Sequence, residues 1–263
     1  MELGLKGRIA FVTGASKGIG RAIAEEFARE GVDLALFSRD RAKCEALAGE
    51  IRAENGAVKV VFSAIDFERP DTIRPAVAAA AEALGGVDIL VNCAGGAPRG
   101  LLEDIGDEKW EEGFAVKPIG LMRMSREVLP FLRRSTQGRI INIAGTRGRE
   151  PSMFSVMAGP INFGTLIATK VLANALGADG ITVNAVNPGS TDTGRWTDLI
   201  GREARERGVS EAEAEKHLLS EVPLGRVVMP GDIANVVVFL ASARAGMISG
   251  AAINVDGGRT RSI

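Results

Sequence analysis

A glycine-rich turn near the start of the chain combines residues that could bind a phosphate group. Residues 13–20 read Thr-Gly-Ala-Ser-Lys-Gly-Ile-Gly, directly after an apolar run and directly before an amphipathic stretch. Gly14 lets the chain turn tightly, Gly18 lets the backbone approach a phosphate, and Gly20 lets a helix pack on a strand. The helix would then offer unpaired N–H groups to a pyrophosphate. The strand before the turn and the helix after it favour a dinucleotide site over a plain turn.

Short apolar runs alternate with longer amphipathic stretches along the chain. Most runs are continuous and rich in Val and Ile, which is typical of strands covered on both faces. Helix-like segments such as 20–31, 41–56 and 70–86 lie between them and have glycine where a helix should stop. The pattern predicts one doubly wound, Rossmann-type α/β domain over residues 1–263, a parallel sheet with helices on both faces. Its seven strands are expected at 8–13, 33–38, 58–66, 88–95, 139–145, 181–189 and 251–258.

The segment from about 191 to 226 interrupts this alternation. It is polar, charged and helix-prone, and it precedes the last expected strand. Ligands of open α/β sheets bind beyond the carboxyl ends of the strands, where a long insertion can cover them. We therefore expect residues 191–226 to form a lid over a substrate.

Four motifs in the same order make the chain similar to the short-chain dehydrogenase/reductases of single-domain type, over essentially its whole length. Residues 13–20 match that family's TGxxxGxG turn, and residues 92–95, Asn-Cys-Ala-Gly, match its NAG motif. Asn-Pro-Gly at 187–189 with Thr193 matches its PGxxxT segment, and residues 255–258 match its closing strand. The resemblance implies an oxidoreductase that acts on a carbonyl or alcohol of a small molecule.

The end of the second expected strand bears on the choice of nucleotide. Enzymes that choose NAD usually place a carboxylate there, whereas the 2′-phosphate of NADP needs cations. Here Ser38 stands in the region of the acid and is followed by Arg39, whose planar guanidinium suits phosphate oxygens. The family often directs a lysine of the glycine turn, here Lys17, to the same phosphate. These residues favour NADP (NADPH) over NAD, and the alternative is that both cations are solvated surface charges.

The resemblance implies a cofactor site that follows the carboxyl ends of the strands. Asp66 and Phe67 would flank the adenine, the NAG motif would line the ribose, and the segment from Pro188 to Thr193 would line the nicotinamide end. The full set is Gly14, Ser16, Lys17, Gly18, Ile19, Gly20, Ser38, Arg39, Asp66, Phe67, Asn92, Ala94, Gly95, Pro188, Gly189, Thr191 and Thr193.

The catalytic positions of the family are all changed. Members carry a serine at the end of the fifth strand, a tyrosine thirteen residues later and a lysine four beyond that; these positions hold Gly145, Ala158 and Asn162. The family's asparagine, seven residues after a tryptophan, corresponds to Lys117. The chain contains no tyrosine, and its single histidine, His217, reads as a surface residue of the insertion.

Asparagine and lysine have thus exchanged places, and this exchange suggests a rebuilt site. Our hypothesis is that Lys117, with Asn162, provides charge or the proton in place of the tyrosine. The alternative is drift at a site that no longer performs the chemistry. Arg147, Arg149 and Glu150 follow the position of the lost serine and could meet an anionic substrate, or form a solvated loop.

Composition excludes several classes of partner. Hydrophobic residues make up 46% of the 263, and the formal net charge is −1, so nothing global attracts nucleic acid or an anionic membrane. No signal peptide or membrane span is evident. Cys44 and Cys93 lack metal-type spacing and are expected as reduced thiols, so we predict a cytoplasmic protein without a metal.

Three functions remain open at this point. The first is an NADP-dependent oxidoreductase with an altered acid. The second is a non-redox lyase or isomerase on the same scaffold, and the third is a catalytically silent nucleotide-binding subunit. Fold does not decide between them. The resemblance also implies a homo-oligomer, a dimer or a tetramer, formed through the helices after the fourth and fifth strands.

Overall fold

A seven-stranded parallel sheet forms the centre of the computed structural model, which describes residues 2–97 and 100–262. The strand order is β3-β2-β1-β4-β5-β6-β7. Each strand lies inside one of the expected runs, so the predicted doubly wound α/β fold is confirmed. The strands are β1 (Ile9–Thr13), β2 (Asp33–Ser38), β3 (Val60–Ala64), β4 (Ile89–Asn92), β5 (Arg139–Ile143), β6 (Thr182–Pro188) and β7 (Ala252–Val255).

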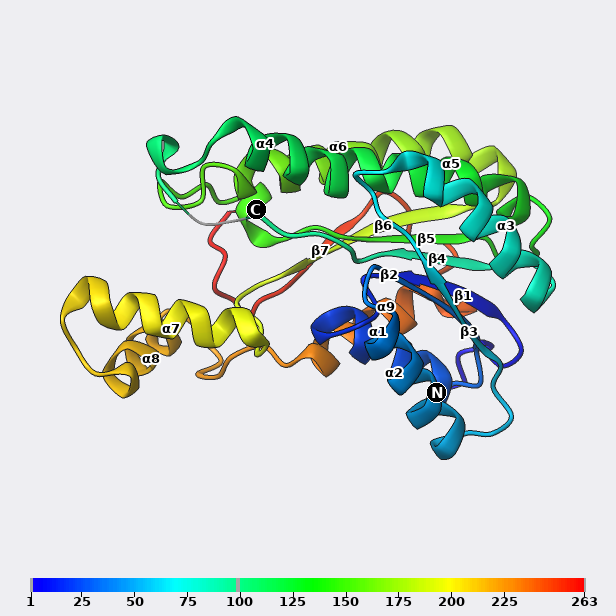
Figure 1. Cartoon of the computed structure of the whole chain (residues 1–263), viewed down its shortest axis with the longest axis horizontal. Helices are drawn as coiled ribbons and strands as arrows, with labels where there is room; N and C mark the ends of the chain where they lie inside the picture. The colour runs from blue at the N-terminus through cyan, green and yellow to red at the C-terminus, as the bar shows by residue number, and fades with distance from the viewer. Residues whose placement is uncertain (1, 98–99, 263) are drawn as a thin grey trace.

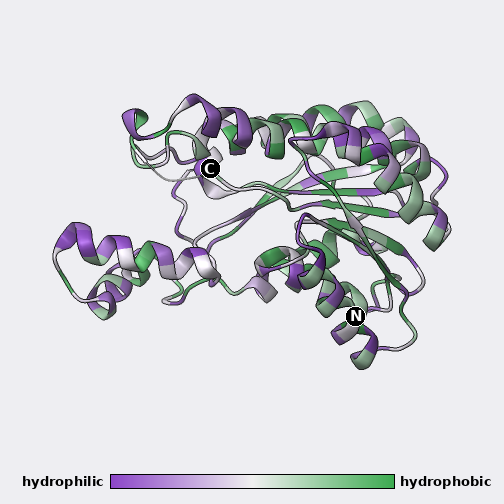
Figure 2. Ribbon diagram, viewed as in Figure 1, coloured by the Kyte–Doolittle hydropathy of each residue, from purple (hydrophilic) through white to green (hydrophobic). Residues whose placement is uncertain are grey.

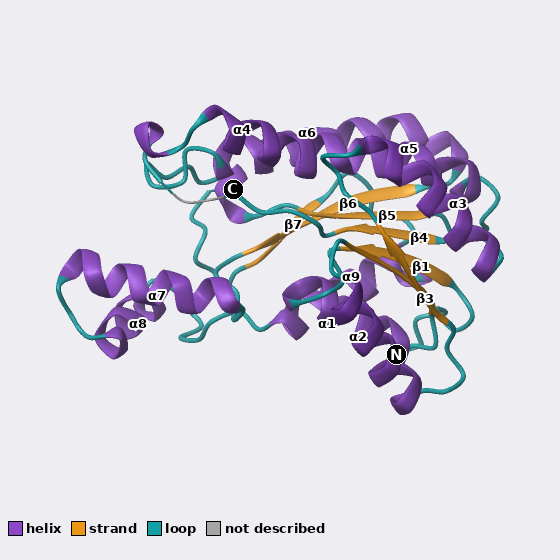
Figure 3. Cartoon of the chain, viewed as in Figure 1, coloured by secondary structure: helices purple, strands orange, loops and turns teal. Residues whose placement is uncertain are grey.

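Helices cover both faces of the sheet (Figures 1 and 3). One face carries α1 (Gly18–Arg29), α2 (Arg41–Glu54) and α9 (Pro230–Ala241). The other carries α3 (Ile73–Leu84), α5 (Gly120–Leu132) and α6 (Ala158–Leu176). The helix α4 (Asp107–Phe114) runs into α5 through a π-helical turn, Ala115–Ile119. Short 3₁₀ turns lie at Pro70–Thr72, Leu102–Asp104, Thr146–Gly148, Gly177–Asp179 and Ala243–Ala245.

Burial on both faces explains why the strands are continuous apolar runs. In β1, Ala10 and Val12 face the core under α1 and α9, while Phe11 faces the core under α3 and α5. All three are fully buried. Successive side chains of a strand point to opposite faces, so two covered faces require apolar residues at every position. Hydrophobic residues accordingly follow the strands in Figure 2.

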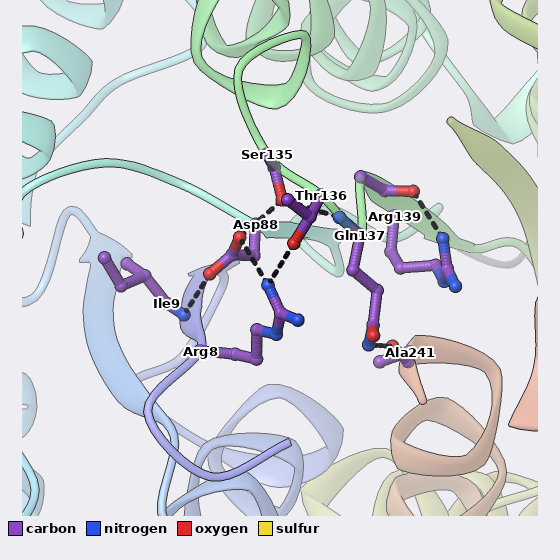
Figure 4. A network of polar contacts seen from close by, with 9 residues as sticks. Arg8, Ile9, Asp88, Ser135, Thr136, Gln137, Arg139 and Ala241 are labelled. Atoms are coloured by element: carbon purple, nitrogen blue, oxygen red, sulfur yellow. Dashed lines mark hydrogen bonds and ion pairs between the residues drawn. The ribbon is translucent and has the colours of Figure 1, made fainter. Parts of the chain in front are cut away.

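A polar network ties the amino ends of the central strands (Figure 4). Asp88, just before β4, accepts a hydrogen bond from the backbone N–H of Ile9 at 3.0 Å and pairs with the guanidinium of Arg8 at 3.4 Å. Gln137, just before β5, donates to the carbonyl of Ala241 at the end of α9 at 3.0 Å. These contacts fix the strands at the edge opposite their carboxyl ends, which stay available for ligands.

The expected insertion forms two helices, α7 (Gly194–Arg207) and α8 (Glu211–Ser220). They project from the body of the molecule in Figure 1 and are largely hydrophilic in Figure 2. Trp196 holds the pair together, since its side chain is buried and its indole N–H donates to Glu215 Oε1 at 3.2 Å. The segment 191–226 therefore has structure of its own beside the carboxyl ends of the strands.

Candidate active site

The turn between β1 and α1 has the conformation that its glycines permit. Gly14 and Gly18 have φ values of +68° and +56°, in the left-handed region that favours glycine. A Cβ on Gly20 would lie 2.3 Å from the carbonyl oxygen of Gly14. Lys17, the residue before α1, makes no side-chain capping bond, so the first N–H groups of the helix are left for a ligand. This arrangement fits a pyrophosphate.

Gly20→Ala should damage this turn, because its methyl group would overlap backbone that cannot move aside. We expect the free energy of unfolding to fall by about 1–3 kcal/mol and binding of the predicted nucleotide to weaken. Urea unfolding measures the first effect. Gly49→Ala is the matched control, because a Cβ on Gly49 in α2 would meet nothing within 4 Å; it should stabilise the helix by roughly 0.5–1 kcal/mol. Equal behaviour of the two variants would contradict the close-packed turn.

Two cations lie near the end of β2. Arg39 is 66% exposed and reaches one acid, Glu68, at 3.3 Å, a surface pair of little strength. Lys17 is exposed and has no carboxylate within 4.0 Å in the described parts of the chain. Asp40, the acid that follows Arg39, caps α2 by accepting the N–H of Lys43 at 3.1 Å and also binds its ammonium. The carboxylate of Asp40 is therefore occupied by Lys43, whereas Lys17 and Arg39 remain available for a phosphate.

The other residues predicted to bind the adenosine follow neighbouring strands along one edge of the sheet. Asn92, at the end of β4, is buried; its Nδ2 donates to Asn142 Oδ1 at 2.9 Å, and its Oδ1 has no partner in the described chain. Ala94 N–H donates to the hydroxyl of Thr13 at 3.0 Å, which joins the NAG segment to the glycine turn. Phe67 is only 6% exposed and its ring packs in the core, so it offers a nucleotide little of its ring.

A pocket of about 650 Å³ opens beyond β4, β5 and β6. It brings together all four positions at which the family's catalytic residues were expected, and it reaches the inner side of the insertion. The predicted residues that line it are Ile19, Gly95, Lys117, Gly145, Ala158, Asn162, Pro188, Gly189, Thr191 and Thr193.

Lys117 enters this pocket from the π-helical turn between α4 and α5. Pro118 within the turn has no N–H to donate to the helix, and wide turns of this kind occur often at functional sites. The side chain is buried, with 9% of its surface exposed. Its Nζ donates to the carbonyl of Ala144 at 2.7 Å and to Asn162 Oδ1 at 2.8 Å. The ammonium is therefore held in place by two oxygens.

Burial changes the acidity of this ammonium. It lowers the pKa of Lys117 to about 8; the Cys93 thiol opposes the shift and the charge of Arg195 adds to it. No carboxylate within 4.0 Å compensates the charge among the described residues. A group with this pKa is charged at neutral pH and can still release a proton.

Asn162 lies between Lys117 and Gly145, and Ala158 precedes it by four residues on α6. Lysine has donors only, so the amide oxygen of Asn162 faces Lys117 and its Nδ2 faces Gly145. A Cβ on Gly145 would lie 3.0 Å from that Nδ2, so a serine there would crowd the amide. Ala158 stands one helical turn before Asn162 on α6, on the same face.

Four polar residues of the pocket are not among the predicted site residues. Ser155 is buried and Thr146 is half-buried, so two hydroxyls lie in the lining. Arg147 is half-buried there as well, and Arg195 lies so close to Gly96 that its Nη2 is 1.7 Å from where a Cβ would stand. The pair of glycines at 95–96 was the available signal for a close approach.

The single histidine of the chain lies outside the pocket. His217 is outside the pocket lining and lies 3.7 Å from Glu203 Oε1 on the neighbouring helix. Across residues 2–97 and 100–262, no group of three or more His, Cys, Asp and Glu side chains is placed to hold a metal ion. In the same residues, no helix combines the length and apolar character needed to cross a membrane.

Comparison with known proteins agrees with the motifs and the fold. The model of a family described as enoyl-(acyl carrier protein) reductase matches residues 14–260. The short-chain reductase protein NovJ of Streptomyces niveus is 36% identical over 256 residues, which cover 95% of this chain and 93% of that protein.

Two solved structures show the same architecture. The L-sorbose reductase of Gluconobacter frateurii, complexed with NADPH and L-sorbose, matches with a TM-score of 0.94 at 31% identity over 100% of both chains. YwfH, an NADPH-dependent reductase involved in bacilysin biosynthesis, matches with a TM-score of 0.91 at 29% identity, covering 97% of this chain and 99% of its own. The chain therefore belongs to the short-chain dehydrogenase/reductase family of oxidoreductases.

Proposed function

We propose that this protein is an NADPH-dependent reductase of a small carbonyl compound and that Lys117 supplies the proton in place of a tyrosine. The observation that carries the proposal is the ammonium of Lys117, fixed by two oxygens in the same pocket as Gly145, Ala158 and Asn162. The NADPH-dependent reductases among the structural neighbours support the choice of cofactor.

The residues present fit NADPH. The uncapped start of α1 and the glycine turn suit its pyrophosphate, Arg39 and Lys17 suit its 2′-phosphate, and the buried, unpartnered Oδ1 of Asn92 suits a ribose hydroxyl. Thr193 lies beside the glycine turn, with its methyl group 3.2 Å from where a Cβ on Gly18 would stand. When bound, NADPH supplies a hydride to the carbonyl carbon of the substrate.

The chain's own residues would manage the proton. An ammonium has three N–H bonds, and two of those of Lys117 are occupied by Ala144 and Asn162. The proton of the third N–H bond can pass to the carbonyl oxygen of the substrate, and this oxygen becomes the hydroxyl of the alcohol. The neutral amine that remains keeps both hydrogen bonds, so the site does not rearrange. Thr146 and Ser155 line the same pocket and can orient the substrate oxygen.

One titration and one assay test the proposal. NADPH fluorescence should change on addition of the protein, and NADPH should then be oxidised in the presence of a member of a panel of ketones, aldehydes and activated alkenes. Tight binding without oxidation by any compound would favour a silent nucleotide-binding subunit. Absence of binding would favour a non-redox enzyme on this scaffold.

We also propose that the protein is a homo-oligomer. Phe163, Ile167 and Val171 form a stripe on α6 at intervals of four residues, and each is at least half exposed. Met122 on α5 is 40% exposed. Apolar stripes of this kind on helices are typical of interfaces between subunits. Light scattering should give a mass of two or four times the 27.6 kDa of one chain; a monomer at micromolar concentration would overturn the proposal.

A further inference from the structure

The pocket contains more positive than negative side chains. Five cations line it against three carboxylates. The cations are Lys117, Arg147, Arg195, Arg202 and Arg259, and the carboxylates are Asp198, Glu203 and Glu221. A concave site with an excess of one charge favours ligands of the opposite charge.

Two of the three carboxylates already have basic partners. Glu221 is ion-paired with Arg259, and Glu203 lies 3.6 Å from Arg207 and 3.7 Å from His217. Asp198 is exposed, on the insertion. The acids therefore leave most of the positive charge of the pocket uncompensated.

Arg147 is a half-buried arginine of the pocket that no carboxylate pairs with directly among the described residues. It is half-buried, and its Nη1 makes one long hydrogen bond, 3.4 Å, to the carbonyl of Glu150. No carboxylate lies within 4.0 Å of it among the described residues. Burial lowers the pKa of Arg147 and the charge of Arg259 lowers it further, while Glu150 and Glu221 oppose the shift more weakly. Arginine side chains are seldom deeply buried without a partner, and carboxylates and phosphates form the strongest hydrogen bonds to them.

The position of Arg147 suits a small substrate. It is two residues beyond Gly145, whose neighbour Asn162 binds Lys117. Arg147 and Lys117 line the same pocket of about 650 Å³, so a ligand that fills this pocket meets both groups. Arg195 stands in the same pocket, over Gly96.

We propose that the substrate is an oxo acid whose carboxylate binds the guanidinium of Arg147 while its carbonyl faces Lys117. This proposal rests on the reductase function proposed above and adds the substrate class. The planar fork of arginine matches the two oxygens of a carboxylate, and such paired bonds are strong and orienting. The carboxylate would thereby fix which face of the carbonyl is presented to the cofactor.

A binding experiment without turnover tests the substrate class. Pyruvate and phenylpyruvate, each beside its methyl ester, are titrated calorimetrically into the protein, with and without NADP⁺. At least one acid should bind about 10-fold or more tightly than its ester, the size expected for a charge-assisted hydrogen bond. Arg147→Gln should remove the preference, and Arg147→Lys should restore part of it.

Arg149→Gln is the matched control, since Arg149 lies two residues away, is exposed and does not line the pocket. It should keep the full preference for the acid. Failure of both acids to bind, equal binding of acids and esters, or an equal loss in Arg149→Gln would overturn the proposal. Titration of NADPH into the same protein preparations, followed by fluorescence, measures cofactor binding separately. Failure of the substrate proposal is therefore distinguishable from failure of the proposed reductase function.

Discussion

Lys117→Met is expected to lower kcat by about 10²–10⁴-fold, the usual contribution of a positioned general acid. Methionine keeps the length and apolar stem of lysine but has no proton to give. The affinity for NADPH should change little, because no other predicted nucleotide residue forms a hydrogen bond with Nζ. Stopped-flow or steady-state oxidation of NADPH with the best substrate of the panel measures the first effect, and fluorescence titration measures the second.

Lys109→Met is the control for this variant. Lys109 lies eight residues away on α4, is 62% exposed and pairs with Glu112. Its replacement should leave kcat unchanged. If Lys117→Met also keeps the wild-type rate, the proposed proton donor is wrong.

The pH dependence of kcat/KM is a second test of Lys117 as the proton donor. The acid is the protonated form, and burial sets the pKa of Lys117 at about 8. Below pH 8 the ammonium is present and kcat/KM should be level; above pH 8 it should fall about tenfold per unit as the proton is lost. A tyrosine acid would stay protonated up to about pH 10 without such a shift. A profile level to pH 10 would exclude Lys117 as the acid.

The sequence allowed the sheet to be predicted because its central strands are buried on both faces. Ala10, Phe11 and Val12 cannot sit on a half-solvated strand, and the same holds for the other central runs. The glycine turn was equally predictable from the sequence, since the positive φ of Gly14 and Gly18 restricts these positions to few residue types. What the sequence did not give is the strand order, which depends on how the crossovers pack.

The contacts of the candidate site were less predictable. Spacing placed Lys117 and Asn162 at the catalytic positions, but their 2.8 Å contact joins residues 45 apart in the chain. For Arg147 the sequence left open a contact with an anionic substrate or a solvated loop; only the folded chain shows that the side chain is half-buried in the pocket. Side-chain burial at the carboxyl edge of a sheet depends on several distant segments, and no local pattern records it.

Lys117 and Asn162, the two residues of the predicted exchange, form a donor–acceptor pair. The ammonium now comes from the π-helical turn and the amide from α6, and they meet at 2.8 Å. Gly145 leaves the space that the amide of Asn162 needs. Drift at an idle site would not be expected to leave a buried charge bonded to two oxygens, because an unneeded buried charge costs stability. This geometry supports the proposal of a rebuilt site over the alternative of drift.

The double variant Lys17→Gln, Arg39→Gln is expected to weaken NADPH binding by about 100-fold or more, since each of the two cations contributes roughly 1.5–3 kcal/mol through a charged hydrogen bond. Binding of NADH, which lacks the 2′-phosphate, should stay within about threefold of wild type because neither glutamine removes a contact to it. Fluorescence titration of both nucleotides gives the ratio directly. Arg41→Gln is the control, because Arg41 is exposed, pairs with Glu45 within α2 and lies only two residues from Arg39.

Salt dependence separates a phosphate site from a general loss of affinity. The wild type should bind NADPH less tightly as ionic strength rises, because exposed charges are screened, and the double variant should lose most of that dependence. Asp40 cannot take over as a ribose acid in the variant while it caps α2 and binds Lys43, so NADH should not gain much. If NADH and NADPH weaken together, the two cations hold the shared part of the nucleotide and the preference for NADP must come from other residues.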